Sequence, residues 1–233
     1  MKKWMLWMGL GTMTLGACQS NETGKQSEEV FKDAHTDSIE VVENDFLLVP
    51  GERAGILTAD MSEVDLIRLL DDAVSPHDTF YTMEGDWVIG TILYKVTPDE
   101  THIIWKDPDQ FRLPDWVGVG FGEPVRQTRW KTNQGVRIGT TLLELEKING
   151  RAFDFWGFGW DMGGTASDWK GGSLQPAPES YFNVTLGYDY DLNQEQELAN
   201  ALLGDQVYSS ARPEAQQLNP KVQTMSIRFQ DPK

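Results

Sequence analysis

Short segments of alternating apolar and polar residues, separated by turn residues, recur along this chain after residue 45. Such segments are typical of strands with one buried face. The clearest is the last, in which Met225, Ile227 and Phe229 alternate with polar residues. Short strands joined by turns favour an antiparallel sheet. We predict strands over residues 79–83, 87–95, 101–106, 117–121, 128–131, 153–158, 181–190 and 222–229.

Helices are expected between these strands, and two of them carry capping-box patterns. The first starts near Asp60, with Glu63 three residues later. The second starts at Thr140 or Thr141, pairs Thr141 with Glu144, and ends at Asn149, before a left-handed stop at Gly150. Their buried faces are expected to consist of apolar side chains, which are Val64, Ile67 and Leu70 in the first helix and Leu142, Leu145 and Ile148 in the second.

A third helix is expected over residues 192–203, capped by Asp191 and ended by Gly204. Helices this short need a sheet to pack on. The sequence therefore predicts an α+β fold, with an antiparallel sheet and two or three short helices packed on one side. Because the first two helices are each followed by aromatic strands, one arrangement of this fold is two similar helix-sheet units, about 45–125 and 126–233.

The first 18 residues have the layout of a bacterial lipoprotein signal peptide. Positive charge at Lys2 and Lys3 precedes an uncharged apolar stretch that is too short to span a bilayer, which needs about 20 apolar residues. The sequence Leu-Gly-Ala-Cys at residues 15–18 then resembles the lipobox cut by lipoprotein signal peptidase. We expect residues 1–17 to be removed and Cys18 to be acylated. The alternative is an ordinary signal peptide followed by a cysteine by chance, but Cys18 is the only cysteine in the chain.

Removal of Lys2 and Lys3 with the signal peptide would take the net charge from -16 to -18. This acidity argues against nucleic acid as a partner, and it implies that acyl chains rather than anionic lipids hold the protein on the membrane. The stretch 18–44 is polar and acidic and is expected to be a disordered tether, followed by a folded domain over 45–233. No cysteine remains for a disulfide, so this domain depends on core burial.

The expected location follows from the residue after Cys18. Gram-negative lipoproteins retained at the inner membrane carry Asp there, and this chain has Gln19. By that resemblance, we expect the protein on the outer membrane, lipid-anchored and facing the periplasm. In a host without an outer membrane, the same signal would leave it on the exterior of the plasma membrane.

Residues 137–150, RIGTTLLELEKING, resemble the opening of small periplasmic modules. These modules belong to the SmpA/OmlA lipoproteins of outer-membrane β-barrel assembly and to the β-lactamase inhibitor protein. In them a strand leads into Gly-Met-Thr, an acidic-apolar helix and a glycine; here Thr140 replaces the Met, and Asn149-Gly150 replaces Leu-Gly. The helix and the following residues 157–161 also resemble an uncharacterised bacterial lipoprotein family, which implies no activity.

A glycine- and tryptophan-rich segment, residues 155–172, is the most distinctive part of the chain. Its aromatic residues next to turns could form a platform for sugar rings or an extended peptide. The alternative is that Phe155 and Phe158 fill the core while the glycines serve bulges and turns. We expect the binding surface to include Trp156, Trp160, Asp161 and Trp169.

Catalytic motifs are scarce. The chain has no Gly-x-Ser-x-Gly sequence, and the domain has only His77 and His102, which we expect to be surface or packing residues. The calcium-like run 189–195 lacks the glycine and glutamate of an EF-hand, so Asp191 is better explained as a helix cap. We therefore assign no catalytic residue and expect no cofactor or metal.

The leading prediction is a lipid-anchored envelope lipoprotein that acts as a non-catalytic binding or assembly module. Its expected partners are the membrane, through the lipid anchor, and an envelope protein or glycan. The alternative is a carbohydrate- or peptidoglycan-active enzyme. Such an enzyme would use two carboxylates about 5 to 10 Å apart, drawn from Asp154, Asp161 and Asp168.

Overall fold

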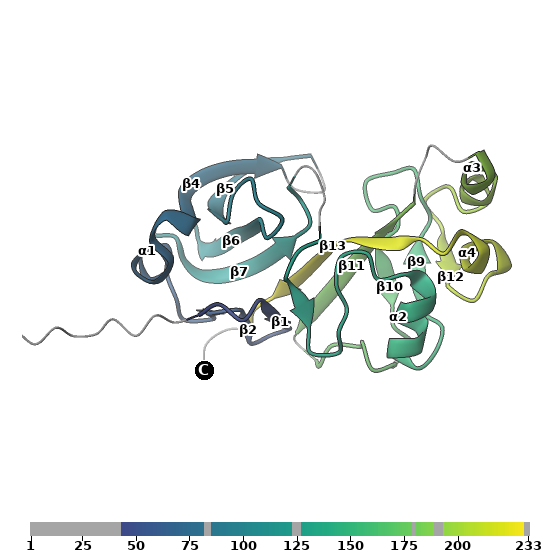
Figure 1. Cartoon of the computed structure of the whole chain (residues 1–233), viewed down its shortest axis with the longest axis horizontal. Helices are drawn as coiled ribbons and strands as arrows, with labels where there is room; N and C mark the ends of the chain where they lie inside the picture. Colours follow the sequence, from purple (N-terminus) through teal and green to yellow (C-terminus); the bar gives the residue numbers. More distant parts are fainter. Residues whose placement is uncertain (1–42, 82–84, 123–126, 179, 189–192, 231–233) are drawn as a thin grey trace, which may run out of the picture. The chain divides into compact units, whose positions relative to one another are not determined.

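The computed structural model describes residues 43–230, except 82–84, 123–126, 179 and 189–192, and leaves the side chains of 193–195 undescribed. In this described part, 13 strands and four short helices form a mixed α+β fold in which sheets dominate (Figure 1). The predicted fold class is confirmed. Nearly all strand pairs are antiparallel, and the exception is the pairing of β1 with β8.

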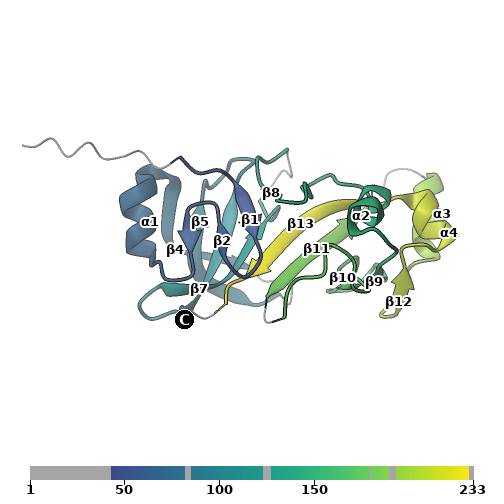
Figure 2. The same cartoon turned by 90° about the horizontal axis from the view of Figure 1, so that it is seen from below.

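The largest sheet has six strands in the order β11-β13-β7-β6-β5-β4, and every pair in it is antiparallel. The strands are β4 (Val74–Tyr81), β5 (Trp87–Leu93), β6 (Thr101–Asp107), β7 (Arg112–Val119), β11 (Tyr181–Gly187) and β13 (Lys221–Arg228). The last strand, β13, lies between β7 and β11, with Met225 opposite both Val119 and Val184 (Figure 2). Strands from the two halves of the chain therefore form one sheet.

Two smaller sheets consist of short strands. One has the order β3-β2-β1-β8, and the other has the order β10-β9-β12. Their bounds are β1 (Leu47–Val49), β2 (Arg53–Ala54), β3 (Leu57–Thr58), β8 (Lys131–Thr132), β9 (Asp154–Trp156), β10 (Ala166–Asp168) and β12 (Val207–Ser209). Five of these strands were not predicted, because two or three residues are too few to show alternation; they are β1, β2, β3, β10 and β12.

The helices are α1 (Glu63–Leu70), α2 (Leu142–Asn149), α3 (Asn193–Asn200) and α4 (Pro213–Leu218), and a 3₁₀ turn, η1 (Asp71–Ala73), follows α1. The prediction for α2 is confirmed: Thr141 and Glu144 form the capping box, and Gly150 is left-handed at φ 76°. Leu142 and Leu145 are fully buried, and Ile148 packs against the core. No helix among the described residues is long and apolar enough to cross a membrane.

The predicted capping pair of α1 was wrong, and of its predicted buried face only Leu70 packs against the core. Ser62, rather than Asp60, caps the helix and shares a capping box with Asp65. The side chains of Val64 and Ile67 are exposed, whereas that of Leu66 is fully buried. For α3, the predicted cap Asp191 lies outside the described residues, and the helix ends at Asn200 rather than Leu203. Helix α4 was not predicted.

The core is one cluster of apolar side chains that extends from the first small sheet to α4. Trp130, Phe153 and Phe155 are its largest fully buried members. Phe158 is also buried, so the interpretation of Phe155 and Phe158 as core residues is confirmed. Full burial of an aromatic side chain of this size contributes roughly 1.5–3 kcal/mol, which a chain without disulfides needs.

Candidate functional site

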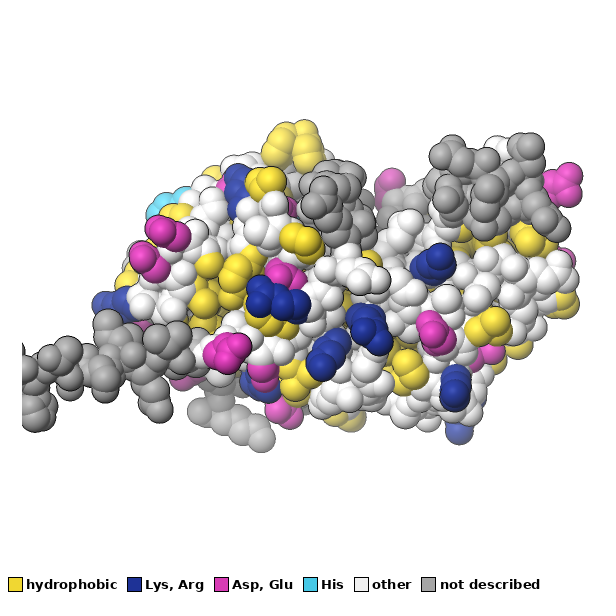
Figure 3. Space-filling view, viewed as in Figure 1, with side chains coloured by type: hydrophobic (Ala, Val, Ile, Leu, Met, Phe, Trp, Pro, Cys, Tyr) yellow, Lys and Arg dark blue, Asp and Glu magenta, His cyan; other side chains and the backbone are white. Residues whose placement is uncertain are grey.

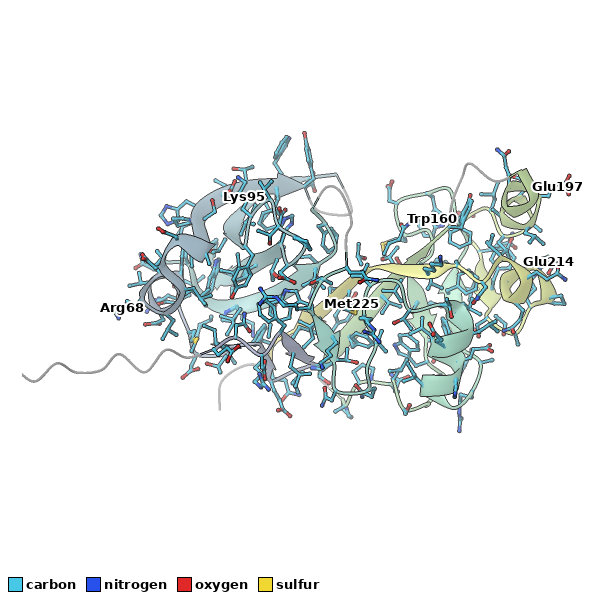
Figure 4. The ribbon with its side chains drawn as sticks, in the orientation of Figure 1. Arg68, Lys95, Trp160, Glu197, Glu214 and Met225 are labelled. Carbon is cyan, nitrogen blue, oxygen red and sulfur yellow. The ribbon has the colours of Figure 1, made fainter. Side chains whose placement is uncertain are left out.

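Two of the predicted surface residues, Trp156 and Trp160, are in contact, and Trp156 is the last residue of β9. Figure 4 labels Trp160. Their ring centroids are 5.4 Å apart, and the rings are nearly perpendicular at 88°. Trp156 is the cross-strand partner of Val207 on β12, and cross-strand partners share a face of the sheet. Val207 is 45% exposed and Trp160 is 37% exposed. We call Trp156, Trp160 and Val207 the tryptophan surface.

Backbone hydrogen bonds hold the turn that carries Trp160. Gly157 N donates to Gln206 O at 2.9 Å, and Phe158 N donates to Leu202 O at 2.8 Å. A Cβ atom at Gly157 would lie 2.5 Å from Gly204 O, so no larger residue fits at this close approach. Trp160 Nε1 donates to Gly157 O at 2.8 Å. The indole N–H is thus satisfied inside the turn, and the exposed part of the ring is apolar.

Of the other two predicted residues, Asp161 is exposed beside Trp160, but Trp169 is not at the surface. The Trp169 side chain is only 4% exposed. Its ring lies 4.9 Å from that of Phe153 and 5.9 Å from that of Phe182, nearly parallel to the latter at 12°. Placing Trp169 on the binding surface was therefore wrong. The prediction relied on the turn glycines that directly follow Trp169 in the sequence. Its stacking partner Phe182 lies on β11, which is distant in the sequence.

Two of the three aspartates proposed for the enzyme alternative are ion-paired with the same lysine. Asp154 and Asp168 are cross-strand partners on β9 and β10. Lys170 Nζ lies 2.5 Å from Asp154 Oδ2 and 3.3 Å from Asp168 Oδ2. The backbone N–H of Lys170 donates a hydrogen bond to Asp168, and this bond lowers the pKa of Asp168 most strongly. The ammonium group of Lys170 lowers it further. A glycosidase acid needs a raised pKa, so this geometry favours an ion-paired role.

The two histidines of the domain pair with carboxylates. His102 is buried, and its Nε2 lies 2.9 Å from Glu100 Oε1, while its Nδ1 has no hydrogen-bond partner. His77 is exposed, and its Nε2 lies 2.9 Å from Oε2 of the buried Glu63. Among the described residues, neither histidine is bonded to a serine or threonine hydroxyl that it could activate as a nucleophile.

No candidate metal site is found among the described residues. No group of three or more His, Cys, Asp or Glu side chains there is placed to hold a metal ion. The calcium-like run 189–195 falls on residues whose side chains are not described. The structure therefore does not test that run.

A second exposed apolar group, which was not predicted from the sequence, lies on the hairpin of β4 and β5. Tyr81 and Trp87 are cross-strand partners whose ring centroids lie 3.5 Å apart. Tyr81, Trp87 and Ile89 are 55%, 61% and 58% exposed. The available signal was a pair of aromatic residues flanking a hairpin turn, but the same pattern also fits a buried pair. We call these three residues the hairpin surface.

Comparison with protein-family models, curated proteins and solved structures found no match to this chain. The resemblance of residues 137–150 to small periplasmic modules therefore stays a prediction. The function must be inferred from the residues themselves.

Proposed function

We propose that this chain is a lipid-anchored bacterial envelope lipoprotein that acts as a non-catalytic binding or assembly module. The signal-peptide pattern and Cys18 support the anchor. The proposed location is the outer membrane facing the periplasm, or the exterior of the plasma membrane in a host without an outer membrane. Its partner is an envelope protein or a glycan, and the acidic net charge argues against nucleic acid.

The observation that carries the binding role is the internal hydrogen bond of Trp160. Because Gly157 O already accepts the indole N–H, this ring is held in place and exposes apolar surface. A ring held in this way loses little conformational freedom when a partner binds. Perpendicular indoles next to Val207 suit the apolar face of a sugar ring or the apolar side chains of a peptide.

The alternative is a carbohydrate- or peptidoglycan-active enzyme. The observation in its favour is that Asp161, which makes no ion pair within the described part of the chain, directly follows Trp160. The ion pairs of Lys170 with Asp154 and Asp168 argue against it, because they leave only one of the three carboxylates unpaired.

One experiment tests the anchor. Cells that express the full chain are labelled with a radioactive or clickable fatty acid, and their membranes are separated. We expect labelled protein in the membrane fraction, and we expect Cys18→Ser to abolish both the label and the lipoprotein-type processing. A Cys18→Ser variant that matures to the same mass and fractionates equally with membranes would refute the anchor.

A second experiment tests the binding role. The lipidated protein is used to capture partners from native membranes, and purified protein is incubated with muropeptides and glycans. The double variant Trp156→Ala/Trp160→Ala should lose a partner that the wild type and the hairpin variant Trp87→Ala both retain. Turnover of a muropeptide or glycan that is abolished by Asp161→Asn would favour the enzyme instead.

A further inference from the structure

Exposed basic side chains without ion pairs gather on one face of this acidic protein. Elsewhere in the described part, cations such as Arg53 and Arg129 are paired with carboxylates. Figure 3 shows Lys and Arg side chains gathered over β8, α2 and the start of β13. The exposed cations of these elements and of the segment between them form no ion pair with any described residue; they are Lys131, Arg137, Lys147 and Lys221. We call them the basic face.

Lys131 and Arg137 point outward because of the turn between them. Thr132 N donates to Val136 O at 2.9 Å, which places these two residues opposite each other. Thr132 and Val136 are both buried. Side chains alternate in extended backbone, so the flanking Lys131 and Arg137 are both directed to solvent, in agreement with their exposure.

Lys221 is brought to the same region by the segment that precedes α2. Thr140 N donates to Arg137 O at 3.0 Å, and Val222 N donates to Thr140 O at 2.8 Å. Thr141 forms an isolated β-bridge with Lys221. Because Val222 is buried, its neighbour Lys221 is directed outward.

Glu144 lies near both Lys147 and Arg137 of the basic face. Hydrogen bonds from Thr141 lower the pKa of Glu144 most strongly, and the charges of Arg137 and Lys147 lower it further. Both cations therefore lie near this carboxylate. The Glu144 carboxylate already accepts hydrogen bonds from Thr141 N and Oγ1. Helix α2 also carries the partly buried Glu146, which accepts hydrogen bonds from Ser210 Oγ and Gln216 Nε2. Four cations against these two carboxylates leave the face with a positive balance.

The N-terminal chain joins the fold beside the basic face. Lys131 N donates to Phe46 O at 3.1 Å, and Leu47 is the cross-strand partner of Lys131. The tether predicted from the sequence, residues 18–44, lies almost entirely outside the described residues. A random coil of that length would reach on the order of 30 Å. An anchor at Cys18 would therefore keep this face within reach of the membrane.

We propose that the basic face binds the phosphate headgroups of anionic lipids in the membrane that carries the anchor. This inference rests on the proposed lipid anchor. Lys and Arg near an anionic surface add affinity that fades within a Debye length. The rest of the protein is strongly acidic and is repelled by the same surface, so attraction at one face and repulsion elsewhere favour a single orientation of the domain.

Vesicle flotation without the acyl chains tests this face separately from the anchor. The chain from residue 18, carrying Cys18→Ser, is mixed at low salt with vesicles of phosphatidylcholine alone or with phosphatidylglycerol. We expect binding only to the anionic vesicles and its loss at high salt. Lys131→Gln/Lys221→Gln should weaken binding about 25-fold, at about fivefold for each cation. The control Arg68→Gln/Arg112→Gln makes the same change in net charge at exposed cations outside this face and should change binding less than about twofold.

Three outcomes would overturn the proposal: no binding to anionic vesicles, equal binding to neutral vesicles, or equal effects of the two double variants. Binding to a soluble phosphorylated glycan without binding to vesicles would identify a glycan site and would also overturn it. Failure of Cys18 acylation in cells would reject the anchor, whatever the vesicles show.

Discussion

The buried carboxylate of Glu63 lies 2.9 Å from Nε2 of His77, whose side chain is exposed. The same carboxylate accepts hydrogen bonds from Thr91 Oγ1 at 2.6 Å and from the backbone N–H of His77 at 3.1 Å. Trp105 Nε1 in turn donates to Thr91 Oγ1 at 2.8 Å. Glu63 therefore joins the first turn of α1 to β4 and β5 and, through Thr91, to β6.

Glu63→Ala should destabilise the protein by about 3 kcal/mol, because hydrogen bonds to a charged group are lost and buried donors are left unpaired. His77→Ala should cost less than about 1 kcal/mol, because the partner that it removes is largely in solvent. Urea unfolding of the two variants measures both values. Equal losses would show that the exposed imidazole, rather than the buried network, holds α1 in place.

Trp169 and Trp160 should respond differently to truncation. Trp169→Ala removes a buried ring that packs on Phe153 and Phe182, so we expect a loss of about 3–5 kcal/mol in the free energy of unfolding. Trp160→Ala removes a partly exposed ring, and we expect a clearly smaller loss. Thermal or urea unfolding tests the difference, and a larger loss for Trp160→Ala would contradict the burial of Trp169.

The capping box of α2 should make stability depend on pH. Hydrogen bonds from Thr141 lower the pKa of Glu144, so Glu144 binds protons more weakly in the folded than in the unfolded protein. Its stabilising contribution is then present above its unfolded pKa and is lost as the pH falls through the folded pKa. We expect Glu144→Gln to be less stable than the wild type at about pH 6, with the difference shrinking toward about pH 3.

Thr141→Ala removes the other half of the same capping box and should cost about 1 kcal/mol. Its loss of stability should depend less on pH than that of Glu144→Gln, because the backbone N–H of residue 141 still donates to Glu144 and only the hydrogen bond from Thr141 Oγ1 is removed. A difference between wild type and Glu144→Gln that stays constant over this pH range would contradict the assignment.

Gly164 and Gly139 both have a left-handed backbone but differ in the space around the Cβ position. Gly164 has φ +81°, and an added Cβ would lie 2.0 Å from Leu186 O; Gly139 has φ +88° and nothing within 4 Å of its Cβ position. Gly139→Ala should therefore cost only the conformational term of about 1–2 kcal/mol. Gly164→Ala adds a backbone clash and should cost about 3–5 kcal/mol. Similar unfolding midpoints for the two variants would refute the close approach at Gly164.

The two capped helices differ in how far their own residues determine the cap. Around α2, the Thr141 and Glu144 pair stands alone, and every observed feature of the helix agrees with the prediction. Before α1, two capping pairs overlap, because Asp60 precedes Glu63 as Ser62 precedes Asp65. Only the tertiary environment of Glu63, which is buried against Thr91, decides between them.

Residues of the candidate site were predicted where local structure decides their position. Local hydrogen bonds help to place Trp156 and Trp160, because Gly164 N donates to Trp156 O and Gly163 N donates to Trp160 O. The bonds of Gly157 and Phe158 to residues 206 and 202 are not local and add to them. The burial of Trp169 depends on its contact with Phe182, which is distant in the sequence. The neighbouring turn residues therefore wrongly predicted that Trp169 lies at the surface. The basic face was hidden for the same reason, since Lys221 joins Lys131 and Arg137 only through non-local backbone pairing.

Because β13 lies between β7 and β11, the largest sheet can be completed only after β13 has been synthesised. Synthesis proceeds from the N-terminus, so β7 and β11 are both complete before Lys221 has been added. Until then, the backbone groups of each that pair with β13 are unpaired, and unpaired strand edges favour aggregation. A chain cut short before residue 221 would leave both edges unpaired, so β13 is required to complete the sheet.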